Sequence, residues 1–306
     1  MQKDVHRVPC IVNNQPLMQT KNQGVQHQVI CGDHQKNLCE FSVSTSEIVS
    51  KAINGALKAK QDWKRMPFGD RAAIFLKAAD LISNRYWPQL LAATMIGQGK
   101  NAWQAEIDAH AELIDFFRFN CKFAGDIYDG ASDGLVSPAS TWNRLECRPL
   151  EGFVAAISPF NFTAIGGNLP TAPVLMGNVA LWKPSSSAVY SNYLIMSILI
   201  EAGLPPGVIQ FLPGSPSPIV ETMLGHPDFA GLHFTGSTGV FQSLWKSIAN
   251  NLDTYKSYPR IVGETGGKNL HFVHNSADVD TVVNQTIRAA FEYQGQKCSA
   301  CSRLYV

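Results

Sequence analysis

The stretch EGFVAAISPFNFTAIGGNLP (residues 151–170) passes from a short apolar run, through a Ser-Pro-Phe-Asn turn, into a segment of helical character. An apolar run of this kind is typical of a strand that is buried on both faces. Similar runs follow, each ending at Gly or Pro: NVALWKP (178–184), VIQFLPG (208–214) and AGLHFTG (230–236). Helical stretches lie between them, at 163–176, 187–203 and 217–226. This alternation predicts a doubly wound α/β fold of the nucleotide-binding type, in which helices cover both faces of a parallel sheet.

The chain before residue 151 has a different character. Residues 1–45 are polar and irregular, with short β-like runs such as CIVNN and HQVIC. A helix is expected to begin at Ser44 or Thr45, and Glu47 lies at capping-box spacing from Ser44. Its apolar stripe is Ile48, Ile53 and Leu57. Two further segments, 70–86 and 104–124, repeat the helical period, and the Gly-, Ser- and Pro-rich residues 129–150 are expected to form a loop.

Composition and charge limit the class of protein. The chain has 306 residues, enough for about two domains, of which 45% are hydrophobic and 16% charged. A net charge of +1 predicts no broad attraction to nucleic acid or to an anionic membrane. No apolar run is long enough to span a bilayer. The start, MQKDVHRVPC, fits neither a signal peptide nor a convincing transit peptide.

The cysteines and histidines do not form a metal-binding pattern. Seven scattered cysteines in a long chain argue against a disulfide framework and favour a reducing compartment. Cys298 and Cys301 form a single C-x-x-C with no second pair at zinc spacing. His271 and His274 lie in NLHFVHNS, which is strand-like, so they would point to opposite faces. We therefore expect no metal site.

Two residues are candidates for covalent chemistry. Cys298, in GQKCSA, is either a reactive thiol, helped by the neighbouring Lys297, or a small buried hydrophobe. Glu264, in VGETGGKN, follows an apolar stretch and precedes two glycines. It is either a general base at the end of a strand or a glutamate in a surface turn.

Three further positions have the chemistry of a binding site. Asn161 follows an apolar strand, where its amide could donate to an oxyanion or cap the next helix. Gly236 and Ser237, in HFTGSTG, stand where a helix N-terminus could accept a pyrophosphate, although the G-x-G-x-x-G fingerprint is absent. Lys183 ends a strand and either contacts a ribose or phosphate or is an ordinary exposed lysine.

The order of these residues along the chain resembles that of the aldehyde dehydrogenase superfamily. The likeness runs from about Pro9 to Val306 and is closest to the branch that oxidises L-glutamate γ-semialdehyde to L-glutamate in proline breakdown. The segments that carry it are EGFVAAISPFNFTAIGGNLP, GNVALWKPS, EAGLPPGVIQF, QAEIDAHAELIDFFRFN and FEYQGQKCSACSRLYV.

The resemblance implies a role for each matching residue. Cys298 corresponds to the nucleophile, Glu264 to the general base, and Asn161 to the side chain that holds the oxyanion with the Cys298 backbone amide. The positions that contact NAD are Ser158, Lys183, Gly236, Ser237, Thr238, Gly239 and Val240. The substrate positions are Glu112, which meets the amino group, and Phe162 and Ser299, which line the aldehyde pocket.

The resemblance also implies a domain plan. It consists of an N-terminal arm (1–45), a Rossmann-like NAD-binding domain with N-terminal helices (46–268), and the start of a second, incomplete α/β catalytic domain (269–306). Superfamily members continue well beyond Val306. We therefore expect a truncated product, a splice form or a partial gene model, without measurable turnover by itself. Full-length members are expected to be homo-oligomers, and the resemblance implies the mitochondrial matrix.

Two alternatives remain open. The chain could be a non-catalytic form that binds NAD or an intact subunit, since the same motifs support both interpretations. It could also act on a different aldehyde, although the segment AELIDFF argues against this.

Overall fold

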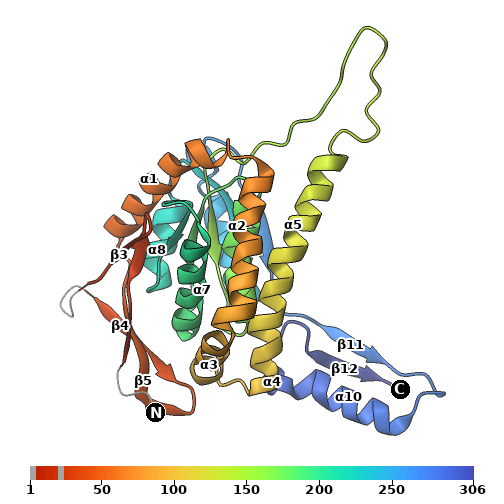
Figure 1. Ribbon diagram of the computed structural model, residues 1–306. Helices are drawn as coiled ribbons and strands as arrows, with labels where there is room; N and C mark the ends of the chain where they lie inside the picture. The colour runs from red at the N-terminus through yellow and green to blue at the C-terminus, as the bar shows by residue number, and fades with distance from the viewer. Residues whose placement is uncertain (1–4, 20–23) are drawn as a thin grey trace.

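A seven-stranded sheet lies at the centre of the computed structural model, which describes residues 5–19 and 24–306 (Figure 1). Parallel strands stand in the order β10-β9-β6-β7-β8, and antiparallel β2 and β3 extend the sheet at its β8 edge. The bounds are β2 (Cys10–Val12), β3 (Gln15–Leu17), β6 (Phe153–Ile157), β7 (Ala180–Lys183), β8 (Ile209–Phe211), β9 (Phe229–Thr235) and β10 (Arg260–Glu264). The predicted doubly wound parallel sheet is confirmed.

The four apolar runs of the sequence are β6, β7, β8 and β9, and nearly all their residues are buried. The three predicted helical stretches are also present, and a further helix joins β9 to β10. These helices are α6 (Thr163–Leu175), α7 (Val189–Ala202), α8 (Pro216–Leu224) and α9 (Thr238–Ala249). The local alternation of strand and helix patterns was therefore sufficient to predict this part of the fold.

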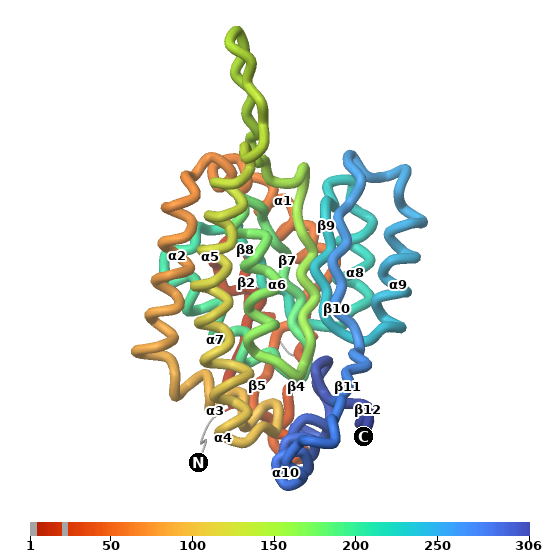
Figure 2. Tube along the Cα trace, turned by 90° about the vertical axis from the view of Figure 1, so that its right-hand side faces the viewer, coloured from red at the N-terminus to blue at the C-terminus, as the bar shows by residue number. Residues whose placement is uncertain are grey.

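Helices cover both faces of the sheet (Figures 1 and 2). α6 and α7 pack on one face, with α2 (Phe68–Leu81) and α5 (Glu112–Gly130) outside them, whereas α1 (Ser46–Trp63) and α8 pack together on the other. The buried Trp63 indole Nε1 donates to the Val174 carbonyl at 2.9 Å, which ties the end of α1 to α6. The strand ends between these layers are therefore held from both sides.

The N-terminal segment is more regular than the predicted irregular arm. β1 (His6–Val8), β5 (Asp33–Ser42) and β4 (Val25–Ile30) form a separate sheet in the order β1-β5-β4. β2 instead joins the central sheet, where Ile11 pairs with Phe211 of β8, about 200 residues later in the chain. The β-like runs CIVNN and HQVIC do correspond to β2 and part of β4, but no local signal in the sequence indicated the distant partner of β2. Residues 1–4 and 20–23 of the predicted arm lie outside the described residues.

Of the two predicted caps of α1, Thr45 is confirmed, whereas the capping box expected between Ser44 and Glu47 is not formed. Thr45 is the cap, and its hydroxyl accepts from the Ile48 amide at 3.4 Å. Ser44 is fully buried: its hydroxyl contacts the Cys10 thiol at 3.3 Å, and its amide donates to the Pro213 carbonyl at 2.9 Å. Ile53 is buried as predicted, but the other predicted stripe residues are only partly buried. The buried face of α1 is Val49, Ala52, Ile53, Ala56, Lys60 and Trp63.

The two remaining helical predictions are confirmed, with π-helical turns added. α2 continues through the turn Ile82–Tyr86 into α3 (Trp87–Gln98). α4 (Ala102–Ala105) continues through the turn Glu106–Ala111 into α5. The predicted loop is also present, because residues 131–150 contain no helix or strand and extend away from the body (Figure 1).

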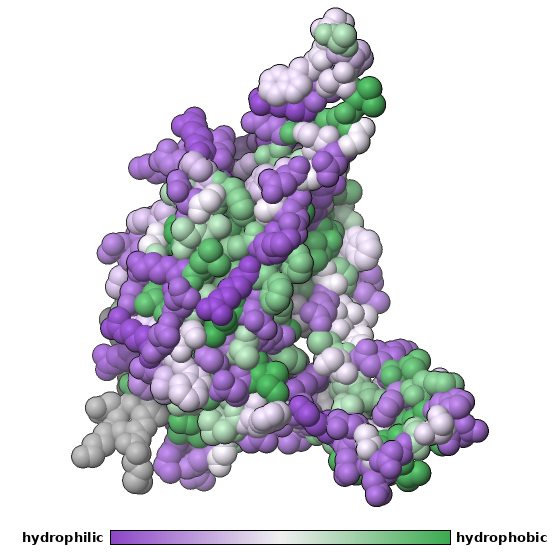
Figure 3. Space-filling model, turned by 45° about the vertical axis from the view of Figure 1, so that its right-hand side comes forward, coloured by the Kyte–Doolittle hydropathy of each residue, from purple (hydrophilic) through white to green (hydrophobic). Residues whose placement is uncertain are grey.

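Within residues 269–306, the two strands and the helix form a small unit that stands off from the body (Figure 1), whereas the loop around Tyr293 contacts the body. β11 (Asn269–Phe272) pairs in parallel with β12 (Cys301–Tyr305), and α10 (Val279–Phe291) lies between them in the chain. Asp278 caps α10 by accepting from the Thr281 amide at 2.9 Å, but no residue of the helix is buried. Apolar side chains therefore gather on the outside of this unit (Figure 3). The division at residues 45 and 268 remains a prediction.

Among residues 5–19 and 24–306, every helix is too short or too polar to cross a bilayer.

Candidate active site

The residues singled out in the sequence converge at the carboxyl edge of the central sheet. The chain runs from β6 through β7 to β8, then returns through α8 to β9 on the other side of β6. In doubly wound sheets, ligands bind outside the carboxyl ends of the strands where the order reverses in this way. The predicted site residues at these strand ends are Ser158 after β6, Lys183 at the end of β7, Gly236 after β9 and Glu264 at the end of β10.

The loop that follows α10 brings Cys298 to these strand ends. Three successive residues, Tyr293, Gln294 and Gly295, have φ angles of 52°, 56° and 71°. This left-handed run is costly for non-glycine residues and therefore needs support from neighbouring contacts. The buried Tyr293 hydroxyl supplies one, because it donates to the Gln98 carbonyl at 2.6 Å.

Cys298 lies between two cavities. The first, of about 690 Å³, is lined by Glu112 and is here called the Glu112 cavity. The second, of about 840 Å³, is lined by Lys183 and is called the Lys183 cavity. Cys298 lines both, and its side chain is partly exposed, so it is accessible to small molecules. The alternative that Cys298 is a small buried hydrophobe is therefore wrong.

The Cys298 thiol is neutral near pH 7. Burial, followed by the hydrogen bond and the negative charge of Glu264, raises the pKa of Cys298 to about 11. Glu264 is thus close enough to accept the thiol proton. The expected help from Lys297 is wrong, because its ammonium group is bound 3.0 Å from carboxylate oxygens of both Asp108 and Glu292.

The backbone carbonyl of Cys298 is held by two residues that the sequence did not identify. The Asn269 Nδ2 donates to the Cys298 carbonyl at 2.5 Å and to the Ala300 carbonyl at 3.3 Å. A Cβ atom on Gly267 would lie only 1.9 Å from the same Cys298 oxygen, so this contact requires glycine. The glycine pair in GETGGKN was the available sequence signal for this close approach.

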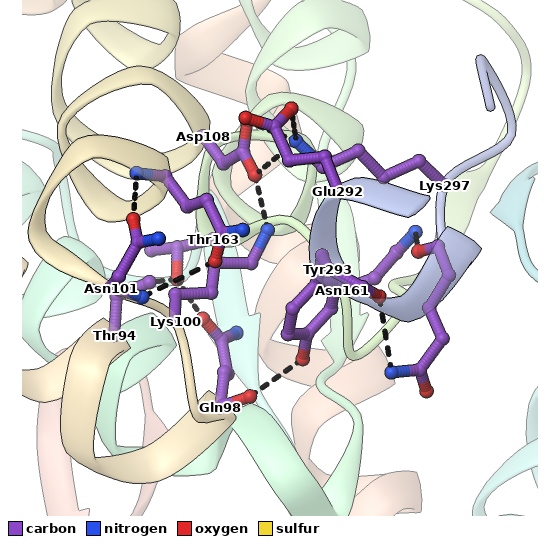
Figure 4. Close-up of polar contacts among 12 residues, drawn as sticks. Thr94, Gln98, Lys100, Asn101, Asp108, Asn161, Thr163, Glu292, Tyr293 and Lys297 are labelled. Atoms are coloured by element: carbon purple, nitrogen blue, oxygen red, sulfur yellow. Dashed lines mark hydrogen bonds and ion pairs between the residues drawn. The ribbon is translucent and has the colours of Figure 1, made fainter. Parts of the chain in front are cut away.

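Asn161 points toward the loop that carries Cys298 (Figure 4). Its Nδ2 donates to the Gln296 carbonyl at 2.8 Å. The alternative role as a helix cap is wrong, because Phe162 occupies the cap position of α6 and no side chain caps this helix. One of the two amide hydrogens of Asn161 remains available to another acceptor.

The Lys183 cavity combines a buried cation with a helix N-terminus. Lys183 is only 6% exposed, and burial lowers its pKa to about 8. The exposed-lysine alternative is therefore wrong, and no ion-pair partner for Lys183 exists within the described part of the chain. Ser158, which also lines the cavity, accepts at its hydroxyl from the Trp182 indole at 3.0 Å.

The N-terminus of α9 forms another wall of the Lys183 cavity. Ser237 caps the helix by accepting from the Val240 amide at 3.4 Å, and Gly236, Ser237 and Val240 line the cavity. Thr238 and Gly239 lie in the first turn of α9 but do not line it. Backbone amides at such a helix end, next to a cation, suit an anionic group such as a pyrophosphate.

The Glu112 cavity brings together the three residues that were expected to contact the substrate, Glu112, Phe162 and Ser299, beside Cys298 and Glu264. The Glu112 Oε2 atom is buried and has no hydrogen-bond partner. Burial, followed by the negative charge of Asp108, raises the pKa of Glu112 to about 7. A buried carboxylate without a partner would be stabilised by a cationic group entering the cavity.

A second charge cluster, which sequence reasoning missed, contributes Asp108, Glu292 and Lys297 to the wall of this cavity (Figure 4 shows the contacts among these residues). Asp108 is buried and forms ion pairs with both Lys100 and Lys297. Lys297 also pairs with Glu292 at 3.0 Å. Asp108 and Lys297 are 189 residues apart, so no local motif could have indicated their contact.

The remaining candidates of the sequence serve local contacts. The His271 Nδ1 is 2.7 Å from the Thr286 hydroxyl, and the His274 Nδ1 is 2.8 Å from the Ser276 hydroxyl. The Cys301 thiol contacts the Arg303 carbonyl at 3.3 Å. Within residues 5–19 and 24–306, no three His, Cys, Asp or Glu side chains are grouped as metal ligands.

Comparison with known proteins identifies the family. The delta-1-pyrroline-5-carboxylate dehydrogenase of Agaricus bisporus is 60% identical over 98% of this chain and 54% of its own length. The mitochondrial human protein of the same name is 52% identical over 98% of this chain and 52% of its own length. This chain thus spans about half the length of these curated relatives.

A solved structure leads to the same assignment. The delta-pyrroline-5-carboxylate dehydrogenase of Mycobacterium tuberculosis, bound with NAD, superposes with a TM-score of 0.94 and 46% identity. The match covers 98% of this chain and 55% of that structure. Residues 19–306 match the aldehyde dehydrogenase family. The chain therefore belongs to the aldehyde dehydrogenase family.

Proposed function

We propose that this chain carries the nucleophile, the general base and the cofactor site of an NAD-dependent enzyme. The proposed reaction is oxidation of L-glutamate γ-semialdehyde to L-glutamate in proline catabolism. The observation that carries the proposal is the place of Cys298, where the Lys183 cavity and the Glu112 cavity meet. A thiol in this position can bond to an aldehyde in one cavity while a cofactor occupies the other.

The residues of the Lys183 cavity fit NAD. The buried, unpaired Lys183 and the nearby Ser158 hydroxyl would contact ribose oxygens, and the amides at Gly236 and Ser237 would meet the pyrophosphate. When bound, NAD supplies a nicotinamide that accepts hydride from the substrate carbon. The Mycobacterium tuberculosis structure, which was solved with NAD bound, supports the same assignment.

The first chemical step belongs to Cys298 and Glu264. The thiol gives its proton to the Glu264 carboxylate as the sulfur bonds to the aldehyde carbon, and the carbonyl oxygen becomes an oxyanion. The free amide hydrogen of Asn161 and the Cys298 backbone N–H donate to that oxygen. Because the raised pKa of Cys298 keeps the thiol neutral, a nearby base is needed to take its proton during the attack.

The second step releases the acid. After oxidation, the acyl group is joined to the Cys298 sulfur as a thioester. Glu264, having lost its first proton to solvent, takes a proton from a water molecule whose oxygen attacks the acyl carbon. The carbon–sulfur bond then breaks, which frees L-glutamate and regenerates the thiol.

The substrate assignment rests on the Glu112 cavity. The unpartnered Glu112 carboxylate would pair with the ammonium group of an amino-aldehyde, while Phe162 and Ser299 line the path to Cys298. The names of the relatives support this choice. Because several relatives are named mitochondrial, we also propose the mitochondrial matrix as the location. The proposal that the full-length protein is a homo-oligomer rests on the family resemblance alone.

A second candidate function is that of a partner for an intact subunit. The apolar side chains along α10 are exposed, and a surface of this kind favours association. Purified as 306 residues and supplied with NAD and glutamate semialdehyde, the chain is expected to bind NAD without steady NADH production. NADH production at the rate of a full-length relative would contradict this expectation.

The test of the proposed chemistry uses a full-length version, spanning the whole length of the curated relatives. Cys298→Ala should abolish oxidation. In Glu264→Gln only the small thiolate fraction can attack, so the acyl-enzyme should form slowly, but it should then accumulate because deacylation also lacks its base; intact-protein mass spectrometry after long incubation would detect it. Cys301→Ser is the matched control and should retain activity. Loss of activity in Cys301→Ser with retention in Cys298→Ser would overturn the assignment of the nucleophile.

A further inference from the structure

Two neighbouring carboxylates, Asp108 and Glu112, differ in whether they are paired with a cation. Asp108 and Glu112 are four residues apart, at the junction of the π-helical turn Glu106–Ala111 with α5. Asp108 is 1% exposed and forms ion pairs with Lys100 and Lys297. Among the described residues Glu112 has no ion-pair partner, and its Oε2 atom has no hydrogen bond. The ammonium groups of the two lysines whose charges act on Glu112, Lys100 and Lys297, are therefore bound to Asp108 instead.

The two lysines are held by more than Asp108. The Lys100 Nζ lies 4.2 Å from the centre of the Tyr293 ring and 4.6 Å from that of Phe162, where cation–π attraction holds it. The Lys297 Nζ lies 3.0 Å from Asp108 Oδ2 and 3.0 Å from Glu292 Oε2 (Figure 4). Asp108 is thus the contact that both lysines share.

The position of these lysines affects what Glu112 can bind. Lys297 and Glu112 line the same cavity, and the charges of Lys100 and Lys297 both act on the Glu112 carboxylate. An ammonium group released from Asp108 would pair with Glu112, because both are partly desolvated there. Such an internal ion pair would compete directly with the ammonium group of a substrate.

We propose that Asp108 is a specificity-determining positioning residue, which holds Lys100 and Lys297 away from Glu112 and so leaves that carboxylate free for the amino group of the substrate. The inference rests on the proposed function, in which Glu112 meets this amino group. If Asp108 served only to hold the Cys298 loop, its loss would instead slow the reaction of every aldehyde alike.

The test compares two aldehydes that differ only at the amino position. Glutamate γ-semialdehyde carries the amino group, and glutarate semialdehyde is the same chain without it. In a full-length version, Asp108→Asn should lower the kcat/KM ratio of the first substrate to the second by about tenfold, chiefly through KM of the amino substrate. Equal loss for both aldehydes would overturn the proposal.

Three further variants keep the result interpretable. Asp108→Glu retains the charge and should keep most of the ratio. Adding Lys100→Met to Asp108→Asn removes one released ammonium group and should recover part of it. If Asp108→Asn does not fold, Glu292→Gln takes its place, since it frees Lys297 from one carboxylate at a partly exposed site. It should lower the ratio by roughly two- to fivefold, and an unchanged ratio would count against the proposal.

Failure of the proposed function would look different. The proposed function predicts that the unmodified full-length version prefers the amino substrate and that Glu112→Gln loses this preference. If neither holds, the substrate assignment itself is wrong. If both hold and Asp108→Asn slows the two aldehydes equally, only the role of Asp108 is wrong. NAD affinity, measured by titration, checks that each variant is folded.

Discussion

The Cys298 thiol lies beside a carboxylate that opposes its ionisation. Replacing Glu264 with Gln removes the negative charge that raises the pKa of Cys298, and it exchanges the carboxylate that accepts from the thiol for a weaker amide acceptor. We therefore predict that Glu264→Gln lowers this pKa from about 11, although burial keeps it above that of a free thiol. At a fixed pH below the midpoint, the thiolate fraction should rise on the order of tenfold for each unit by which the pKa falls.

Alkylation by iodoacetamide measures this shift. Its rate at Cys298, followed by peptide mass spectrometry across pH 7 to about 11, should have its midpoint at lower pH in Glu264→Gln. Cys301→Ser is the control and should leave the profile of Cys298 unchanged. A midpoint that stays in place or moves to higher pH would show that Glu264 does not act on the thiol.

Replacing Lys183 is expected to change protein stability and NAD binding in opposite directions. Its pKa falls from 10.5 to about 8 on burial, so the unfolded chain binds this proton more strongly than the folded chain. Burying the charged Lys183 therefore lowers the free energy of unfolding by about 3 kcal/mol at pH 7. This loss of stability disappears as the pH rises through 8 to 10.5, where the folded chain first and then the unfolded chain releases the proton. Lys183→Met should raise the free energy of unfolding at pH 7 by about 1–3 kcal/mol and weaken NAD binding.

Denaturant unfolding at pH 7 and pH 10, with an NAD titration, tests both parts. The stabilisation should be larger at pH 7 than at pH 10. Lys246→Met, at an exposed position of α9, is the matched control and should change stability little at either pH. Unchanged NAD affinity in Lys183→Met would remove Lys183 from the cofactor site.

At the scale of elements, the connection from β10 to β11 fixes how closely the Cys298 loop approaches the strand ends. Gly267 in this connection contacts the Cys298 carbonyl so closely that a Cβ atom would lie 1.9 Å from it. Gly267→Ala should push the loop away, cost about 1–3 kcal/mol of stability and reduce kcat on the order of a hundredfold. Thermal unfolding, kcat and the alkylation rate of Cys298 measure these effects.

The adjacent glycine provides the control. A Cβ atom on Gly266 would have the Thr238 hydroxyl as its nearest neighbour, at 3.9 Å. Gly266→Ala should therefore leave the unfolding temperature and the alkylation rate of Cys298 close to those of the unmodified protein. Equal effects of the two substitutions would mean that the contact at Gly267 does not position the loop.

The elements also show where sequence reasoning succeeds. β6 to β9 and their helices were predicted because an apolar run and a helical period are both local signals. Ser44 was wrongly considered as a cap of α1, because its hydrogen bond to Pro213 involves a residue far along the chain that no local pattern reveals. Asp108 was missed for the same reason, because its ion pair with Lys297 exists only after folding.

Among the site residues, prediction depended on position relative to strands. Lys183 and Glu264 were found because both end strands of the sheet, where ligands of this fold class bind. Their states could not be predicted, since the burial of Lys183 and the contact of Glu264 with Cys298 arise from tertiary packing. The roles assigned to Glu112, Phe162 and Ser299 came from family resemblance and remain proposals.

At the scale of the whole molecule, the exposed face of α10 makes a prediction about solution behaviour. Its apolar side chains recur every fourth residue and are between 49% and 72% exposed: Val279, Val283, Ile287 and Phe291. As a chain of 306 residues, the protein should associate through this stripe. Ile287→Glu with Val283→Lys should reduce association, which light scattering at increasing concentration would detect.

The control places the same charges on a polar part of the helix. Asn284→Lys with Gln285→Glu changes two exposed positions outside the stripe and should leave light scattering unchanged. If both pairs reduce association equally, net polarity rather than the apolar stripe governs it.

The pairing of Ile11 with Phe211 has a consequence for synthesis on the ribosome. β2 is among the first segments to be made, but the strand that covers its edge is completed about 200 residues later. At roughly 5–20 residues per second, β2 must wait on the order of 10–40 s for its partner. During that interval Cys10, Ile11 and Val12, all buried in the finished fold, can pair only with the short neighbouring strand β3 and not with the rest of the sheet. The nascent chain therefore emerges with an apolar segment that a chaperone can bind, and the first strand of this sheet to be synthesised joins it only after β6, β7 and β8 have been made.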